Sequence, residues 1–138
     1  MSEAPKPVRI GLLGHGTVGG AFAKLIAERA DAVAAASGRR PEISGVLRTS
    51  EGSFDEILAD SDVIVELIGG LDPAKDYVLA ALEAGKPVVT ANKQLVARHG
   101  EQLFAAAREH DVQLRFEAAV AGAIPVIRVV QELSLIHI

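Results

Sequence analysis

The sequence predicts an α/β fold, a doubly wound parallel sheet within a single domain. Short apolar runs alternate with longer amphipathic stretches, a pattern typical of β-α-β units that build a parallel sheet. The length of 138 residues is that of one ordinary domain with its own core. A glycine-rich turn, GLLGHGTVGG at residues 11–20, joins the first apolar run to the first amphipathic stretch.

The first strand and helix are expected near the N-terminus. Residues 8–14 (VRIGLLG) are nearly all apolar, as in a strand that is covered on both faces. The alanine-rich residues 30–37 extend the helix that follows or form a second short one, and Gly38 is its C-terminal stop. The helical period that defines this helix runs through Val18, Phe22, Leu25, Ile26 and Arg29.

Two further strands are expected before residue 70. Residues 43–47 form the second strand, and residues 62–67 (DVIVEL) form the third. The segment between them begins with residues 49–53 (TSEGS), which have the composition of a loop. Gly69 and Gly70 end the third strand.

The next helix and strand have boundary signals of their own. Asp72 followed by Pro73 provides an N-cap and a first-turn proline for a helix that runs to Gly85. Residues 87–91 (PVVTA) then form the fourth strand.

The remaining elements continue the same alternation. Residues 92–110 are expected to be helical with an interruption near His99 and Gly100. Residues 112–118 (VQLRFEA) form the fifth strand, and a last helix begins at Pro125.

The carboxyl ends of parallel strands meet at one edge of the sheet. Right-handed connections between consecutive strands make this edge the place where doubly wound proteins bind their ligands. Motifs at this edge therefore receive the functional interpretation first. The expected strand ends are Gly14, Leu47, Ile68, Thr90 and Ala118.

The glycines after the first strand fit the G-x-G-x-x-G pattern of Rossmann-like dinucleotide-binding domains. Gly14 allows the tight turn, Gly16 lets the backbone approach a pyrophosphate, and Gly19 lets the helix lie close to the strand. The amides around Thr17 and Val18 then point at the phosphates from the positive end of the helix dipole. The alternative is a glycine turn that binds nothing.

The end of the second strand favours NADP as the cofactor, with NAD as the alternative. In NAD-binding domains an Asp or Glu at this position binds the adenosine ribose 2′-hydroxyl, whereas an arginine accommodates a 2′-phosphate. This strand ends at Leu47, Arg48 and Thr49, where Arg48 suits a 2′-phosphate, with Arg39 and Arg40 as candidate helpers. The alternative is that all three arginines are solvated surface residues.

Composition excludes several other classes of partner. The net charge is −4, and no cluster of Lys and Arg is interleaved with aromatic residues, so no nucleic-acid partner is expected. No apolar run approaches the roughly 18 residues of a membrane span, and the N-terminus carries no targeting pattern. The absence of cysteine excludes disulfides and thiolate metal sites. We therefore expect a cytoplasmic protein with a small-molecule ligand.

Three segments resemble homoserine dehydrogenases. They are DVIVELIGG, GKPVVTANKQLVARHG and FEAAVAGAIPVI, and each lies at one of the strand ends; the glycine loop is similar to that family's loop as well. The resemblance covers roughly residues 8–132. It implies NADPH- or NADH-dependent reduction of L-aspartate 4-semialdehyde to L-homoserine, in the biosynthesis of threonine, methionine and isoleucine.

The resemblance also implies roles for individual residues. Thr17 and Val18 would contact the cofactor, and Gly69 would lie along its adenosine and ribose side. Thr90 and Lys93 of the TANK segment would reach the nicotinamide end. A lysine there can bind a ribose hydroxyl or a substrate oxygen, and its charge favours an anionic substrate.

Two strand-end glutamates are open to more than one interpretation. Glu66 and Glu117 could form a carboxylate pair for acid-base chemistry, or either could be bound to backbone amides. In the family that the chain resembles, the residues that match Glu117 and the main-chain carbonyls of Val120, Gly122 and Ile124 surround a monovalent cation, usually sodium. Hard oxygen ligands suit such an ion.

The resemblance further implies how the chain is organised. Residues 1–132 correspond to the NAD(P)-binding domain, and residues 133–138 (LSLIHI) form a tail that does not match. Family members continue into a domain that binds the substrate, carries the catalytic residues and forms a homodimer. We expect no catalytic residue in this chain, weak cofactor binding, and no turnover by the chain alone.

Two alternatives stay open at this point. One is a related amino-acid dehydrogenase such as aspartate dehydrogenase, which has a similar glycine loop and sheet. The other is a stand-alone nucleotide-binding module without catalysis, which the short length favours.

Overall fold

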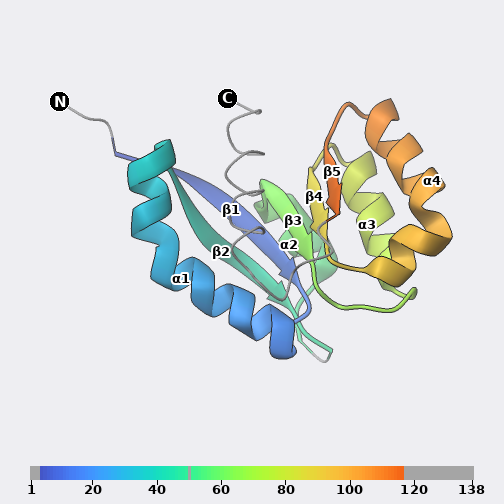
Figure 1. Cartoon of the computed structure of the whole chain (residues 1–138), viewed down its shortest axis with the longest axis horizontal. Helices are drawn as coiled ribbons and strands as arrows, with labels where there is room; N and C mark the ends of the chain where they lie inside the picture. The colour runs from blue at the N-terminus through green and yellow to red at the C-terminus, as the bar shows by residue number, and fades with distance from the viewer. Residues whose placement is uncertain (1–3, 50, 117–138) are drawn as a thin grey trace.

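The computed structural model describes residues 4–49 and 51–116, which form one parallel sheet with helices on both faces (Figure 1). The strand order is β2-β1-β3-β4-β5. The chain thus moves outward from β1 in one direction and then returns to build the sheet in the other. This confirms the predicted α/β, Rossmann-like, doubly wound fold.

Nine elements follow one another along the described chain. They are β1 (Lys6–Leu13), α1 (Thr17–Ser37), β2 (Arg39–Leu47), α2 (Phe54–Asp60), β3 (Val63–Glu66), α3 (Ala74–Glu83), β4 (Val88–Thr90), α4 (Lys93–Glu109) and β5 (Leu114–Phe116).

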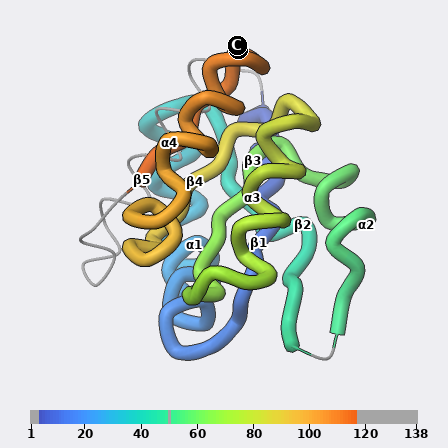
Figure 2. The backbone as a smooth tube through the Cα atoms, turned by 90° about the vertical axis from the view of Figure 1, so that its right-hand side faces the viewer, coloured from blue at the N-terminus to red at the C-terminus, as the bar shows by residue number. Residues whose placement is uncertain are grey.

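The helices divide unequally between the two faces of the sheet. α1 lies on one face, whereas α2, α3 and α4 lie on the other (Figure 2). On the first face Phe22 and Ile26 of α1 pack against the strand side chains of a core cluster that includes Leu12. On the second face the cluster joins all three helices to the sheet and includes Leu82 and Leu103. Alternate strand residues serve opposite faces, which explains the continuous apolar runs in the sequence.

Two helices run without the breaks that the sequence leaves open or predicts. α1 runs without a break through the alanine-rich residues 30–37 to Gly38, which adopts φ +73° and ends it. α4 continues through His99 and Gly100, where an interruption was expected. One glycine within a helix costs only about 1 kcal/mol. The buried stripe of α4 continues on both sides of Gly100 and outweighs this cost.

α2, the connection between β2 and β3, was not predicted from the sequence. Ser53 is its N-cap and accepts a hydrogen bond from the Glu56 backbone amide. Ser53 followed three residues later by Glu56 is the capping-box pattern, so the signal was present in the sequence. Ile57 is the buried anchor of this short helix.

Two further boundaries differ from the prediction. The helix after β3 has Pro73 at its N-cap position and no side-chain cap bond, so Asp72 is not the N-cap. β2 begins at Arg39 rather than Ile43 and includes Pro41. β2 is an edge strand, where the missing amide of a proline is tolerated.

Part of the C-terminal prediction lies outside the described residues. β5 forms within the expected segment. The last helix expected from Pro125 and the tail 133–138 fall in residues 117–138. Within residues 4–49 and 51–116, no helix combines the length and apolar character needed to cross a membrane.

Two adjacent glycines of α1 give a matched test of how the helix packs on the sheet. A Cβ at Gly19 would overlap the Gly14 carbonyl oxygen and lie 2.8 Å from its carbon, whereas a Cβ at Gly20 meets only His15 Cε1 at 3.8 Å. We expect Gly19→Ala to lower the free energy of unfolding by about 1–3 kcal/mol. Gly20→Ala should raise it by up to about 1 kcal/mol. Urea unfolding followed by circular dichroism measures both, and equal effects would contradict the packing.

Candidate functional site

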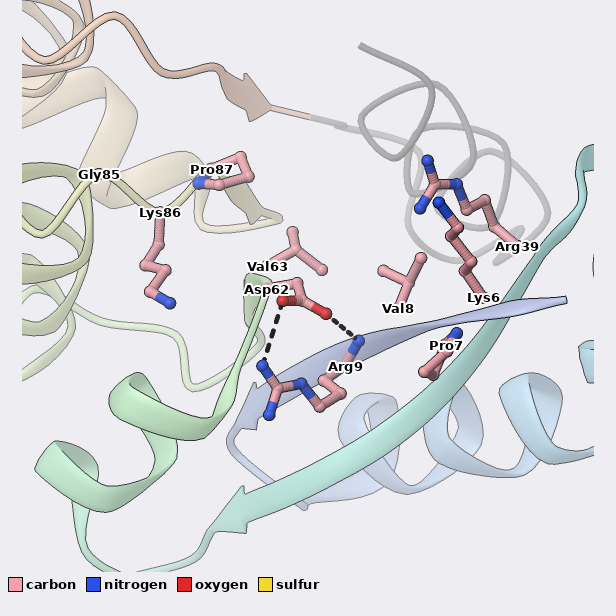
Figure 3. Close-up of a pocket in the computed structure, with 10 residues that line it drawn as sticks. All are labelled: Lys6, Pro7, Val8, Arg9, Arg39, Asp62, Val63, Gly85, Lys86 and Pro87. Carbon is pink, nitrogen blue, oxygen red and sulfur yellow. Dashed lines mark hydrogen bonds and ion pairs between the residues drawn. The ribbon is translucent and has the colours of Figure 1, made fainter. Parts of the chain in front are cut away.

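Two hollows lie at opposite edges of the sheet. One, of about 710 Å³, lies at the amino ends of the strands and is lined by Lys6, Arg9, Arg39, Lys86 and Asp62, among others (Figure 3). The other, of about 1030 Å³, lies at the carboxyl ends and includes the glycine loop.

The charges of the amino-edge hollow have a structural explanation. Arg9 pairs with Asp62 through both its backbone amide, at 2.8 Å, and its guanidinium, at 3.4 Å (Figure 3). Lys86 Nζ donates to the Ser61 carbonyl at 2.7 Å. α1, α2 and α3 end at this edge, and the carbonyl ends of helices carry partial negative charge. Arg9 is thus paired with a carboxylate and Lys86 with a carbonyl at the end of α2, and we place the functional site at the other edge.

The carboxyl-edge hollow lies where the strand order reverses. β2 lies on one side of β1 and β3 on the other, and doubly wound sheets bind ligands in the crevice at this point. The loop after β1, the end of β2 and the loop after β3 all contribute to its lining. Among the predicted residues, Gly14, Gly16, Thr17, Val18 and Arg48 line it.

Each glycine of the motif has a distinct geometry. Gly14 adopts φ +99°, a conformation that other residues rarely take, and its amide donates to the Leu47 carbonyl at 2.9 Å. Gly16 faces open space, because a Cβ there would meet nothing within 4 Å. Gly19 packs on the Gly14 carbonyl and does not line the hollow. The loop is thus tied to β2 on one side and open on the other.

The N-terminus of α1 presents unsatisfied amides to the hollow. Gly16 is the N-cap, and across this helix, which the structure describes in full, no side chain caps the first turn and no acidic residue lies in it. The amides of Thr17, Val18 and Gly19 have no acceptor within the helix. Ser53 and Asn92, by contrast, cap α2 and α4. Open amides at the positive end of a helix dipole are suited to bind a phosphate.

Apolar side chains flank these amides. Val18 is 46% exposed and Ile68 is 36% exposed, and both line the hollow together with Tyr77. Large exposed apolar side chains beside a polar cradle suit a ligand with flat rings and a charged centre.

The end of β2 places opposite charges in the hollow. Arg48 and Glu51 both line it, within a turn closed by hydrogen bonds from the Arg48 amide to the Glu51 carbonyl, 2.9 Å, and back, 3.4 Å. Glu51 is not among the site residues predicted from the sequence. The sequence did contain a signal for this residue, because Glu51 is an acidic residue just beyond the second strand. This is the residue type that binds a ribose 2′-hydroxyl.

The predicted helper role of Arg39 and Arg40 is wrong. They begin β2 at the opposite edge of the sheet, and the strand's nine residues separate them from Arg48, about 30 Å at ~3.3 Å per residue. Arg40 pairs with Asp31 of α1, and Arg39 lines the amino-edge hollow. Residues near one another in sequence need not share a strand end.

Glu66 and Thr90 form a buried hydrogen-bonded pair. Both residues are 0% exposed, and Thr90 Oγ1 donates to Glu66 Oε1 at 2.7 Å. Glu66 Oε2 accepts from the amides of Ile68, 2.8 Å, and Gly69, 3.1 Å. Glu66 is therefore a strand-end acid bound to backbone amides, one of its two sequence interpretations. The Thr90 side chain faces the interior of the protein, which corrects its predicted contact with a ligand.

The segment after β4 carries Lys93. Asn92 caps α4 through Oδ1, which accepts from the Leu95 amide at 3.0 Å, and its Nδ2 donates to the Gly70 carbonyl at 2.6 Å. Lys93 is the first residue of α4 and is exposed. Gly69 adopts φ +82° and is also exposed. Neither Lys93 nor Gly69 lines the carboxyl-edge hollow.

The predicted cation site lies outside the described residues. Glu117, Val120, Gly122 and Ile124 all fall within 117–138. Over the rest of the chain, leaving aside 1–3 and 50, no group of three or more His, Cys, Asp or Glu side chains could hold a metal ion.

Comparison with known proteins gives one consistent result. Residues 14–117 match the family model described as "Homoserine dehydrogenase, NAD binding domain". The homoserine dehydrogenase of Neisseria gonorrhoeae is 42% identical over 142 residues, which cover 92% of this chain and 33% of the relative. That of Pseudomonas aeruginosa is 43% identical over 141 residues, which cover 92% of this chain and 32% of the relative.

Solved structures agree with the sequence relatives. The S. aureus homoserine dehydrogenase has a TM-score of 0.75 at 36% identity and covers 82% of this chain and 33% of its own. That of Thiobacillus denitrificans has a TM-score of 0.75 at 37% identity and covers 83% of this chain and 30% of its own. A hyperthermophilic archaeal homoserine dehydrogenase in complex with NADPH, 22% identical, shares the fold with a TM-score of 0.69.

The extent of these matches defines what the chain represents. It spans about a third of the length of the curated relatives that it matches. The family model covers most of the chain and includes the glycine loop, the end of β2 and the turn before α4. The chain belongs to the homoserine dehydrogenase family, and what it contains of that family is the NAD-binding domain.

Proposed function

We propose that this chain is the cofactor-binding part of a homoserine dehydrogenase and that it binds NADP, with NAD as the alternative, in the carboxyl-edge hollow. The observation that carries the proposal is the uncapped N-terminus of α1, which opens into the hollow beside Gly16. It provides an anion site next to apolar side chains at the point where the strand order reverses.

Different residues of the hollow bind different parts of the cofactor. The amides of Thr17 and Val18 hold the pyrophosphate, and the Arg48 guanidinium binds the 2′-phosphate of the adenosine ribose. Val18 and Ile68 offer apolar contact to the flat rings. When bound, the nicotinamide supplies or accepts a hydride.

Three further residues act from neighbouring segments. The exposed loop at Gly69 lies along the adenosine and ribose side, and Lys93 reaches the nicotinamide end from the first position of α4. Thr90 acts indirectly, through its buried bond to Glu66.

The whole protein has the wider role that the resemblance implies. We propose that it reduces L-aspartate 4-semialdehyde to L-homoserine as a homodimer, for the synthesis of threonine, methionine and isoleucine. A substrate domain beyond these 138 residues supplies the catalytic groups. The Glu117 carboxylate and the carbonyls of Val120, Gly122 and Ile124 hold a sodium ion, for which hard oxygen ligands are suited.

Titration of the 138-residue chain with NADPH tests the core of the proposal. We expect a dissociation constant between about 1 μM and 1 mM by isothermal calorimetry, because the chain supplies only part of the full binding surface. Thr17→Asp should weaken binding at least about tenfold, since it puts a negative charge where the pyrophosphate binds.

Thr17→Asp should weaken cofactor binding but increase the stability of the protein without cofactor. An aspartate at the first position of α1 complements the helix dipole and should stabilise the fold by about 0.3–1 kcal/mol. Ala21→Asp adds the same charge one turn further along an exposed face, and should leave the affinity within about twofold. Equal affinities for Thr17→Asp and the original chain would refute the phosphate site.

The turn after β2 allows the choice of cofactor to be tested with two substitutions that each remove one charge. Arg48→Gln should weaken the binding of NADPH about tenfold and leave the binding of NADH nearly unchanged, because only NADPH carries the 2′-phosphate. Glu51→Gln should tighten NADPH severalfold, because it removes a like charge from the same turn. Parallel titrations with both nucleotides measure the ratio, and equal losses for both after Arg48→Gln would contradict the 2′-phosphate role.

A further inference from the structure

We infer that Glu66 is a positioning residue that holds two cofactor-binding segments, the loop after β3 and the turn before α4, at a fixed separation. The effect on the cofactor rests on the proposed function, whereas the coupling of the two segments does not.

The burial of Glu66 needs an explanation. It is 0% exposed at the end of the central strand β3, opposite Leu13 of β1 and Thr90 of β4. A buried carboxylate is tolerated only when its oxygens are hydrogen-bonded, and an apolar residue would fill such a place with less penalty. Both oxygens of Glu66 are occupied, one by each of the two segments.

The first set of bonds fixes the loop after β3. Oε2 accepts from the Ile68 and Gly69 amides, so the peptide between these residues has one orientation. Gly69 and Gly70 both have positive φ, and glycines lose the most conformational freedom when a loop becomes ordered. The bonds to the carboxylate offset that loss and hold the exposed Ile68 side chain at the hollow.

The second set of bonds fixes the turn before α4. The Thr90 hydroxyl donates to Glu66 Oε1, and its oxygen accepts from the Asn92 amide at 3.1 Å. Asn92 in turn donates to the Gly70 carbonyl and caps α4. A ring of hydrogen bonds therefore runs from Glu66 through Thr90 and Asn92 back to the β3 loop, and Lys93 follows Asn92 directly.

The two ends of this ring carry different parts of the proposed site. Ile68 and Gly69 belong to the adenosine and ribose side, and Lys93 belongs to the nicotinamide side. A dinucleotide binds tightly only if both sides are already at the right separation, because ordering loops on binding reduces affinity. Glu66 sets that separation without touching the ligand.

Variants of Thr90 test the link while leaving the carboxylate in place. Thr90→Val keeps the shape of the side chain but removes the hydroxyl, and it should weaken the binding of NADPH about tenfold. Thr90→Ser restores the hydroxyl and should recover the affinity to within about threefold. The affinity of Glu66→Gln for NADPH should lie between those of these two variants. The glutamine NH2 group can only donate to the Thr90 hydroxyl, whereas the carboxylate oxygen that it replaces accepts from it.

Val65→Ala is the matched control for a loss of stability. Val65 lies in the same strand, is also 0% exposed, and faces the opposite side of the sheet. It should lower the unfolding temperature at least as much as Thr90→Val, yet leave the affinity for NADPH within twofold at a temperature where every variant is folded. Equal affinities for Thr90→Val and Val65→Ala would overturn the positioning role.

Amide hydrogen exchange, measured without any ligand, separates this inference from the proposed function. The Ile68 and Gly69 amides should exchange at least about tenfold faster in Glu66→Gln and Thr90→Val, and at the original rate in Val65→Ala. If the original chain fails to bind NADPH, the proposed function fails, and the exchange rates still decide whether Glu66 couples the two segments. Unchanged exchange in both variants would refute the coupling.

Discussion

The common direction of the five strands decides where charge gathers in this protein. In a parallel sheet every connecting helix begins at the carboxyl edge and ends at the amino edge, so the helix dipoles point the same way. Lys86 lies at the amino edge, where its ammonium group satisfies the Ser61 carbonyl at the end of α2. The open amides of α1 lie at the other edge. The two hollows therefore differ in which charged and polar groups line them, as well as in size.

The helices at the carboxyl edge begin in different ways, and the difference has a functional meaning. Ser53 and Asn92 cap α2 and α4 with side-chain oxygens, which satisfies their first turns within the protein. α1 has a glycine at the same place, which leaves its amides available. The close contact of Gly19 with the Gly14 carbonyl brings this helix directly against β1. The stability lost by leaving a helix uncapped is what makes an anion site available.

Glu66 illustrates a similar relation between stability and function. A buried charged group on the central strand is less favourable than an apolar one, but the two oxygens of this carboxylate bind two separate segments at once. Burial of the carboxylate lowers the stability of the core, and its hydrogen bonds order the glycine-rich loop at the edge of the sheet. The Asn92 side chain extends the same network to α4 and to the residue that follows.

The order of elements, the glycine turn and the edge that carries the site could be predicted from the sequence, because they depend on periodicity and turn chemistry within a few residues. Gly14 needed no tertiary information, since its positive φ follows from the tight turn after the first strand. The orientation of Thr90, the separation of Arg39 from Arg48, and the entry of Glu51 into the hollow could not be predicted in this way. They depend on which strands lie side by side and in which register, and long-range packing decides both.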